Sequence, residues 1–191
     1  MFSSVVAQLR GVPPRTAPVK SRREHSAELN APEWQNGPMR DRARGYAHRV
    51  DIAADPSEVW RALTEAEHLV RWCSPGAQIR AKQGGLFRAS VDRVTELEAH
   101  IDKFEPGRRL RLIYLPSKAL PPTDDPLVDD FILDAKSATD ASQGTILRLL
   151  GSGIPATEEW NRQYQRLKLG WQQAMTRLKV FTEKQLRSKA S

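Results

Sequence analysis

Residues 160–181 read WNRQYQRLKLGWQQAMTRLKVF, and this stretch decides the fold. Its large apolar residues recur at alternating spacings of four and three, which places them along one face of a helix about six turns long. A coiled coil has the same spacing, but four bulky aromatic side chains disfavour a two-stranded seam. The pattern therefore predicts a long C-terminal helix that lies across a sheet of its own chain. The residues of this stripe are Trp160, Tyr164, Leu167, Trp171, Ala174, Leu178 and Phe181.

The segments before this helix alternate between apolar and polar residues, which is typical of half-buried strands. Gly84-Gly85 and Pro106-Gly107 supply tight turns between them. Because about six or seven strands follow one another with short links, we expect an antiparallel sheet. A proline-rich loop at 116–126 and a turn at 140–144 interrupt the series. The predicted strands are 48–52, 77–81, 87–91, 94–105, 110–114, 127–135 and 145–150.

Two short helices are predicted between the first and second strands. Residues 55–58 (Asp-Pro-Ser-Glu) combine an N-cap residue, a proline at the first helical position and an acid at the third. Residues 64–67 (Thr-Glu-Ala-Glu) repeat the capping-box pattern nine residues later, and residues 74–76 (Ser-Pro-Gly) end the second helix. Helices this brief suit a connector that packs across the end of the sheet.

The order of strand, two short helices, strand meander and long helix resembles the helix-grip fold of the START-like (SRPBCC) superfamily. Within it, the chain looks most similar to the family of activator of heat-shock protein 90 ATPase homologues, in their C-terminal domain. The resemblance covers residues 48–184, and Trp72-Cys73 departs from it, since the family often has two adjacent tryptophans there. The matching segments are Val59-Trp60-Arg61-Ala62-Leu63-Thr64, His68-Leu69-Val70-Arg71-Trp72, Gly84-Gly85-Leu86-Phe87-Arg88, Glu105-Pro106-Gly107-Arg108-Arg109-Leu110, Gly144-Thr145 and Gly170-Trp171.

The resemblance implies an α+β helix-grip domain, in which a curved antiparallel sheet and the long helix enclose a cavity. Members of the family include bacterial proteins of unknown role, binders of apolar small molecules, and eukaryotic co-chaperones. The co-chaperones carry a separate N-terminal domain that contacts the chaperone, and we expect no room for it in this chain.

Positive charge is concentrated before the predicted domain. Residues 1–45 contain eight Lys and Arg against four Asp and Glu, a net charge of +4, whereas the other 146 residues contain 22 against 19, a net charge of +3. Together with five prolines in that segment, this predicts a disordered basic tail at 1–45, a domain at 46–186 and a short tail at 187–191.

The first tail also bears on localisation. No acidic residue precedes Glu24, so its composition resembles an organellar presequence. A loose extension of the domain, or a start codon placed too far upstream, explains the same composition. We expect a cytoplasmic protein, with organellar targeting as the alternative.

Composition argues against several classes of function. Cys73 is the only cysteine, so no internal disulfide can form. The four histidines and this cysteine lack metal-ligand spacing, so neither a metal nor another cofactor is expected. No apolar run reaches the roughly 20 residues of a membrane span. The predicted domain has no basic motif with interleaved aromatic residues, so we expect no nucleic-acid partner.

We expect a ligand cavity between the sheet and the long helix, lined by aromatic side chains of both elements. Plain core packing would use the same side chains. His100 is the candidate that can change its charge near neutral pH, and Glu98 and Asp102 could orient it as a general base. A solvated surface explains these neighbours as well. The candidate pocket residues are Trp72, Phe87, His100, Phe104, Tyr114, Trp160, Tyr164 and Trp171.

Other features are interpreted as structural. Strand alternation places His100 and Phe104 on one face and Ala99 on the other. Cys73 follows a helix C-terminus, where the helix dipole opposes a thiolate, so we expect it to pack in the core. Four aspartates lack the glycine and the terminal glutamate of a calcium-binding loop, so we expect a solvated loop there. These are Asp124, Asp125, Asp129 and Asp130.

The expected function is non-enzymatic binding of a small hydrophobic or amphipathic molecule in the cavity. One alternative is a protein-interaction module, similar to co-chaperones and related to activators of heat-shock protein 90 ATPase. Another is a cyclase- or hydrolase-like enzyme of the same superfamily, with His100 as its base.

Overall fold

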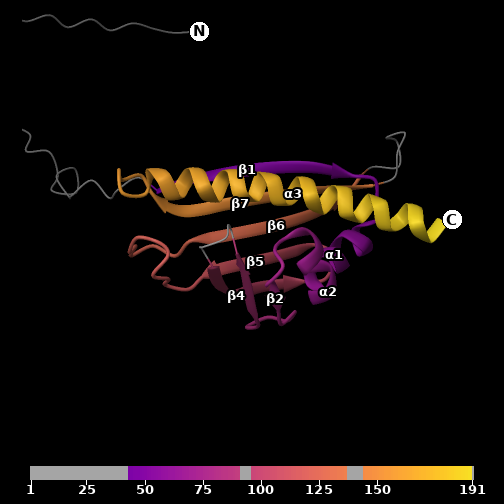
Figure 1. Cartoon of the computed structure of the whole chain (residues 1–191), viewed down its shortest axis with the longest axis horizontal. Helices are drawn as coiled ribbons and strands as arrows, with labels where there is room; N and C mark the ends of the chain where they lie inside the picture. The colour runs from indigo at the N-terminus through magenta and orange to yellow at the C-terminus, as the bar shows by residue number, and fades with distance from the viewer. Residues whose placement is uncertain (1–42, 91–95, 137–143, 191) are drawn as a thin grey trace, which may run out of the picture. The chain divides into compact units, whose positions relative to one another are not determined.

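Seven antiparallel strands form a curved sheet in the computed structural model, which describes residues 43–90, 96–136 and 144–190 (Figure 1). The strand order is β1-β7-β6-β5-β4-β3-β2, so consecutive strands are neighbours and the first strand is added beside the last. The strands are β1 (Ala43–Ile52), β2 (Gln78–Ile79), β3 (Leu86–Ser90), β4 (Glu96–Glu105), β5 (Arg109–Tyr114), β6 (Val128–Ala135) and β7 (Thr145–Pro155).

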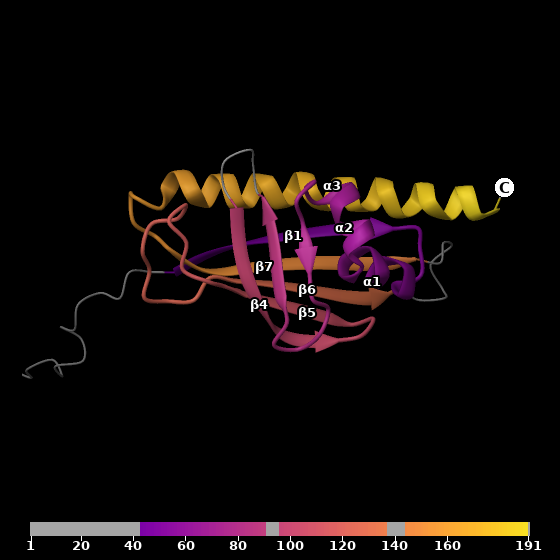
Figure 2. The same ribbon diagram turned by 60° about the horizontal axis from the view of Figure 1, so that its bottom comes forward.

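The described helices pack on one face of this sheet (Figure 2). α1 (Pro56–Thr64) and α2 (Ala66–Trp72) follow β1, and α3 (Asn161–Ala190) follows β7. α3 runs along β1 and contacts both short helices. The sequence-based prediction of an α+β helix-grip fold is confirmed, with a long C-terminal helix laid across an antiparallel sheet.

Several elements are longer than predicted. β1 begins at Ala43, before the predicted strand 48–52 and the predicted domain start at residue 46, because it pairs with β7 as far as Pro155. β7 passes through an irregularity at Gly153, whose φ of 80° favours glycine. α3 continues to Ala190, so residues 187–190, predicted as a tail, are helical. Residues 1–42 of the predicted N-terminal tail and most of the predicted turn at 140–144 lie outside the described residues.

The start of α2 differs from the prediction. Asp55 is the N-cap of α1, and Pro56 is its first residue, as the sequence indicated. The second capping box was wrong, because Thr64 ends α1 and its hydroxyl donates to the Trp60 carbonyl oxygen at 2.8 Å. Glu65 occupies the N-cap position of α2 instead. The repeated motif therefore marked the helix junction but not the capping residue.

A bulge in β4 corrects a second prediction. The register shifts between Ile101 and Lys103, which reverses the alternation beyond that point. Phe104 consequently packs on Trp60 of α1, with ring centres 5.1 Å apart, and does not share the face of His100. A single extra residue in the strand thus moves Phe104 to the helix-bearing face.

The core lies between the inner face of the sheet and the inner stripe of α3. Of the predicted stripe, Tyr164 and Phe181 are partly buried, and Trp160, which precedes the helix, is 1% exposed. Burial of this apolar area is the main favourable term for the domain. The other stripe residues, Leu167, Trp171, Ala174 and Leu178, are buried against β-strand residues such as Leu97, Leu112, Phe131 and Leu149.

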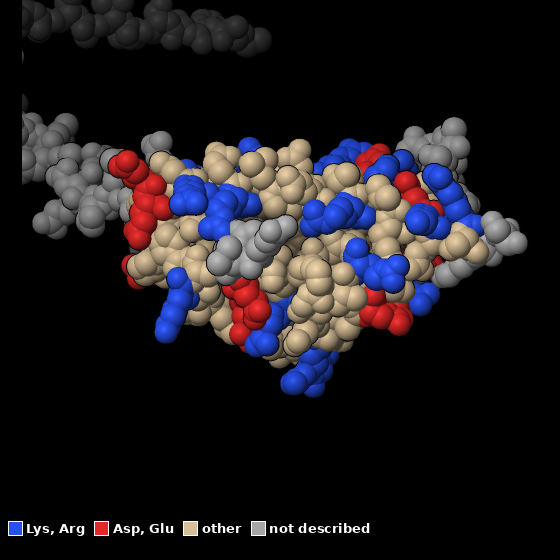
Figure 3. Space-filling view, viewed as in Figure 1, with Lys and Arg blue, Asp and Glu red and all other residues tan. Residues whose placement is uncertain are grey.

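Positive charge is concentrated on α3. Residues 161–190 contain eight Lys and Arg and one Glu, a net charge of +7, whereas residues 43–160 contain 15 basic and 18 acidic residues, a net charge of −3. Figure 3 shows Lys and Arg side chains along the part of the surface formed by α3. These charges make α3 too polar to cross a membrane, and no other described helix is long and apolar enough to do so.

Candidate ligand site beneath α3

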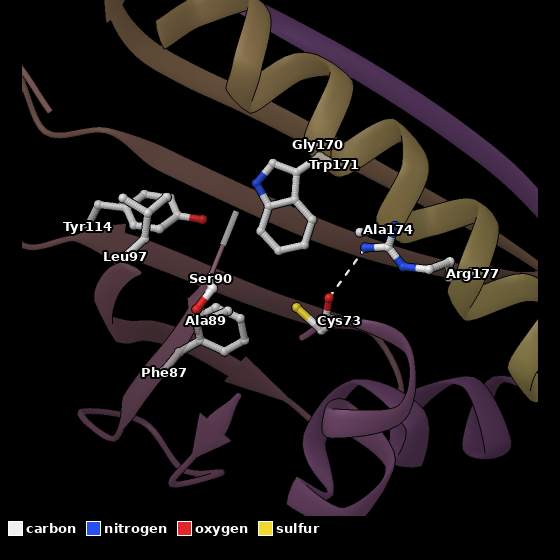
Figure 4. A pocket seen from close by; sticks show the side chains of 10 residues that line it. All are labelled: Cys73, Phe87, Ala89, Ser90, Leu97, Tyr114, Gly170, Trp171, Ala174 and Arg177. Carbon is white, nitrogen blue, oxygen red and sulfur yellow. Dashed lines mark hydrogen bonds between the residues drawn. The ribbon is translucent and has the colours of Figure 1, made fainter. Parts of the chain in front are cut away.

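A small pocket lies between α3 and the inner face of β3, β4 and β5 (Figure 4). Its volume is about 30 Å³, which gives room for about two water molecules. The exposed Arg177 and the half-buried Cys73 and Ser90 mark its mouth, whereas the buried Tyr114 and Trp171 mark its deep end. The lining residues are Cys73, Phe87, Ala89, Ser90, Leu97, Tyr114, Gly170, Trp171, Ala174 and Arg177.

Arg177 ties α3 to the end of α2 at the pocket mouth. Its guanidinium donates to the carbonyl oxygen of Trp72 at 2.8 Å and to that of Cys73 at 3.3 Å. Carbonyl groups at a helix C-terminus carry partial negative charge, which favours a cation there. These two contacts join the elements on either side of the mouth.

The thiol of Cys73 is a weaker acid than an ordinary cysteine in this setting. Burial raises the pKa of Cys73 to about 12, although the charge of Arg177 lowers it. The side chain packs against the core, which confirms the structural role predicted for it.

A buried carboxylate lies behind the deep end of the pocket. Asp129 of β6 is 0% exposed and accepts hydrogen bonds from the hydroxyls of Tyr46 and Tyr114, both at 2.7 Å. Gly151 of β7 makes the contact with Tyr46 possible, because a Cβ atom at position 151 would lie 2.3 Å from Tyr46 Cζ. Strands β1, β5 and β7 thus place one hydroxyl on each carboxylate oxygen.

Burial decides the protonation of this cluster. Loss of hydration raises the pKa of Asp129 to about 6, although hydrogen bonds from Tyr114 and Tyr46 lower it. Burial, followed by the charge of Asp129, also raises the pKa of both tyrosines well above 10, so they remain donors. The cluster therefore carries one negative charge above a pH of about 6 and is neutral below it.

Trp171 joins this cluster to the pocket. Its side chain is 6% exposed and packs edge-on against Phe131, with ring centres 5.3 Å apart. The indole N–H faces the Tyr114 side of the pocket (Figure 4) and lies close enough to Asp129 and to the Tyr114 hydroxyl to lower the pKa of each. Among the described residues, no acceptor meets this N–H in good hydrogen-bonding geometry. The deep end of the pocket thus contains a buried donor that lacks a well-aligned acceptor.

Three of the predicted pocket residues meet in this pocket. Phe87 comes from β3, Tyr114 from β5 and Trp171 from α3. Trp72 is buried beside them but does not line the pocket, because its indole N–H donates to the Ala62 carbonyl oxygen at 2.8 Å. Its role is to join α2 to α1.

Trp160 and Tyr164 lie at the other end of α3, outside the pocket. The Trp160 indole donates to the Pro122 carbonyl oxygen at 3.3 Å and borders an open groove of about 620 Å³ under residues 114–127. The Tyr164 hydroxyl donates to the Gly45 carbonyl oxygen at 3.2 Å, and the Arg44 guanidinium lies 4.6 Å above its ring centre. Both side chains fasten the start of α3 to neighbouring segments.

The structure does not bring His100 to the pocket. Ala99 and Ile101 point inward from β4, so His100 between them points to the opposite face, where it is half-buried. The carboxylates predicted to orient it are engaged elsewhere: Glu98 contacts Arg88 at 3.3 Å, and Asp102 contacts Arg111 at 3.7 Å.

The interpretation of the four aspartates was wrong for two of them. Asp124 and Asp125 are exposed in the loop, but Asp129 and Asp130 are buried residues of β6. Asp129 and Tyr46 are the functional candidates that sequence reasoning missed. Every second residue of the predicted strand 127–135 lies on the same face, and that set contains Leu127, Asp129, Phe131 and Leu133. That alternation alone could have indicated that Asp129 points inward.

Metal ligands were not expected, but one described group brings several ligand-type atoms together. Donor atoms of Glu65, Glu67 and His68 lie within 4.8 Å of one another. Arg61 already contacts Glu65 at 2.8 Å, and His68 contacts it at 3.3 Å. We assign no metal to this group.

A curved sheet that encloses a small site beneath a long C-terminal helix defines a helix-grip protein of the START-like (SRPBCC) class. The chain belongs to the family described as "Activator of Hsp90 ATPase homolog 1-like protein", whose sequence model matches residues 53–183. The family predicted from sequence is thereby confirmed.

Solved structures show the same fold. Protein MLL2253 from Mesorhizobium loti is 25% identical, with a TM-score of 0.62 over 74% of this chain and 98% of that one. CalU16 from Micromonospora echinospora is 22% identical, with a TM-score of 0.56 over 76% and 80%. The Aha1 dimer from Colwellia psychrerythraea is 15% identical, with a TM-score of 0.56 over 72% and 98%. A search of curated proteins found no match.

Proposed function

We propose that this domain binds a small hydrophobic or amphipathic molecule in the pocket beneath α3, without catalysing a reaction on it. The observation that carries the proposal is the contrast inside the pocket. Its walls are apolar, yet its deep end holds the buried N–H of Trp171 and the hydroxyl of Tyr114. Ligand sites typically combine apolar walls with a few polar groups that fix orientation.

The pocket must widen to hold such a molecule, because about 30 Å³ accommodates little more than solvent. Two features control its width. The hydrogen bonds of Arg177 hold α3 against the end of α2, and the Trp171 ring fills the space above Phe87. Opening of the mouth at Arg177, or rotation of the Trp171 side chain, would enlarge the space for a ligand.

A thermal-shift screen tests the proposal. Lipids, sterols and polyketides are added to the full-length protein, and a bound compound is expected to raise Tm, because it stabilises the folded state alone. Ser90→Phe places a ring at the mouth and should abolish the shift. Ser57→Phe adds the same ring at an exposed site in α1, away from the pocket, and should retain the shift. A screen in which no compound raises Tm, or in which Ser90→Phe leaves every shift intact, would refute binding in this pocket.

A co-chaperone-like protein interaction is a second candidate, favoured by the family match over residues 53–183. Its test is a pull-down with an Hsp90-type chaperone and a measurement of the chaperone's ATPase rate. Absence of both capture and rate change would remove it. An enzymatic role is not part of the proposal, because Glu98 and Asp102 pair with arginines rather than with His100.

A further inference from the structure

The hydrogen-bonding groups at the deep end of the pocket specify which chemical group fits there. The Tyr114 hydroxyl donates its hydrogen to Asp129, so its oxygen can still accept a hydrogen bond. The Trp171 indole offers an N–H donor and no acceptor. Both side chains line the same pocket, and the indole nitrogen faces the Tyr114 side (Figure 4).

From this pairing we infer that the deep end binds a hydroxyl group, and that the ligand is a small apolar alcohol or phenol. The hydroxyl oxygen accepts the Trp171 N–H, and its hydrogen is donated to the Tyr114 oxygen. The inference rests on the proposed function, because it names the ligand chemistry of the same pocket.

Three other polar groups satisfy fewer partners. A carbonyl oxygen accepts from Trp171 but donates nothing to Tyr114, whose own hydrogen is held by Asp129. An ammonium group has only donors, so it cannot accept a hydrogen bond from the Trp171 N–H. A carboxylate would lie close to Asp129, and carboxylates at short range repel each other. Of the four groups compared, the hydroxyl is the one that satisfies both partners.

The space in the pocket agrees with this assignment. A hydroxyl group needs about the room of one water molecule, which the pocket already provides. From there, the buried side chains of Phe87, Leu97 and Ala174 form apolar walls for the body of the ligand. That body would extend toward the mouth at Arg177, where the site can widen.

Phenol and toluene test the inference, because the two molecules have nearly the same size and only phenol carries a hydroxyl. Isotope-labelled full-length protein is titrated with each compound, and the indole N–H signals are followed by NMR. The signal missing from Trp171→Phe belongs to Trp171. We expect phenol to shift this signal and to bind about tenfold more tightly than toluene, because its hydroxyl makes two hydrogen bonds in the pocket and loses those that it made to water.

Two variants separate the hydroxyl contacts from general binding. Trp171→Phe removes the N–H donor but keeps an aromatic ring, and should bring the affinity for phenol down to that for toluene. Tyr114→Phe removes the acceptor and should have the same effect. Trp60→Phe and Tyr164→Phe make the same changes outside the pocket and should leave both affinities unchanged. Circular dichroism melting confirms that each variant is folded.

The results distinguish this inference from the proposed function. Equal affinity for phenol and toluene, unaffected by either pocket variant, would overturn the hydroxyl site but leave an apolar ligand pocket in place. Failure of both compounds to bind would also overturn it. In that case the thermal-shift screen, with Ser90→Phe as its blocked variant, still decides whether the pocket binds another ligand.

Discussion

Asp129 and Asp130 are adjacent in β6, yet the two faces of the sheet give them opposite surroundings. Asp129 points to the helix-bearing face, where two tyrosine hydroxyls donate to it. Asp130 points to the outer face, where Arg109 lies 2.6 Å away and Arg111 3.0 Å away. Burial raises the pKa of Asp129 to about 6. Burial also acts to raise the pKa of Asp130, but the hydrogen bonds from both arginines outweigh it and lower that pKa.

This difference shows that the two faces accommodate polar groups by different means. On the outer face, hydrogen bonds from two partly exposed arginines keep a carboxylate ionised although burial has removed most of its hydration. On the inner face, neutral donors hold a carboxylate that has lost its hydration, which makes its negative charge unfavourable. An interior that satisfies polar groups through neutral hydrogen bonds is suited to an uncharged ligand group, in agreement with the hydroxyl inferred above.

Gly151→Ala should break the inner arrangement with the largest effect. The added methyl would meet the Tyr46 ring and push its hydroxyl away from Asp129. Overpacking and the loss of a hydrogen bond to a buried acceptor each cost about 1–3 kcal/mol. We expect the free energy of unfolding, measured by urea denaturation, to fall by about 3 kcal/mol.

Gly76→Ala is the matched control for this change. No atom outside its immediate neighbours lies within 4 Å of a Cβ at position 76, so the same methyl should change stability by less than about 0.5 kcal/mol. If Gly151→Ala proved as stable as Gly76→Ala, the Tyr46 ring would not be confined against β7, and the cluster would be looser than described.

Asp129→Asn should reveal the cost of the inner charge through its pH dependence. The unfolded chain releases the Asp129 proton near 3.8 and the folded protein near 6. Between these values the folded state binds more protons, so the stability of the native protein falls as pH rises. The asparagine side chain has no acidic proton to release, so the variant should escape this fall. From pH 4.5 to pH 7.5, the stability difference between the two proteins should change by about 2 kcal/mol in favour of the variant.

Urea denaturation at several pH values measures this difference. The asparagine also has a cost that does not depend on pH, because its NH2 group cannot accept the hydrogen bond of one tyrosine hydroxyl. This cost cancels when the two pH values are compared. A stability difference that stays constant between pH 4.5 and pH 7.5 would show that Asp129 has an ordinary pKa in the folded protein. The contrast with Asp130 would then disappear.

The fold could be predicted because its signals are local. The spacing of Trp160 to Phe181 defined one helix face, and strand alternation defined the inward residues of β5 and β7. The β4 bulge could not be predicted in this way, because one additional residue reverses every later position and leaves composition unchanged. Phe104 and His100 were therefore placed on the same face in error.

The site was only partly predictable, because its partners come from distant segments. The prediction included Phe87, Tyr114 and Trp171 because each is an aromatic residue on the inward face of its strand or helix. The Asp129 cluster depends on Tyr46, which lies 83 residues away and reaches the carboxylate only because β1 is added beside β7. No local pattern encodes that pairing. Asp129 was therefore grouped with the loop aspartates that precede it in sequence.

Asp130→Asn should show the smallest effect, with the opposite dependence on pH. Since the folded-state pKa of Asp130 is lowered, its contribution is fully present above the unfolded value of 3.8 and is lost as pH falls through the folded value. Arg109 and Arg111 are about a third exposed, so solvent weakens both ion pairs. We expect a loss of about 1 kcal/mol at pH 7 that shrinks as the solution is acidified below pH 4.

Asp134→Asn provides the matched control on the same face of β6. Its ion pair with Arg148 is nearly half exposed, so its removal should cost less than about 0.5 kcal/mol at any pH. Urea is the suitable denaturant, because guanidinium would screen the pairs being measured. If Asp130→Asn instead gained stability relative to the native protein as pH rose, as expected of Asp129→Asn, the outer face would penalise charge as the inner face does. The two aspartates would then differ in their partners but not in the sign of their electrostatic contribution.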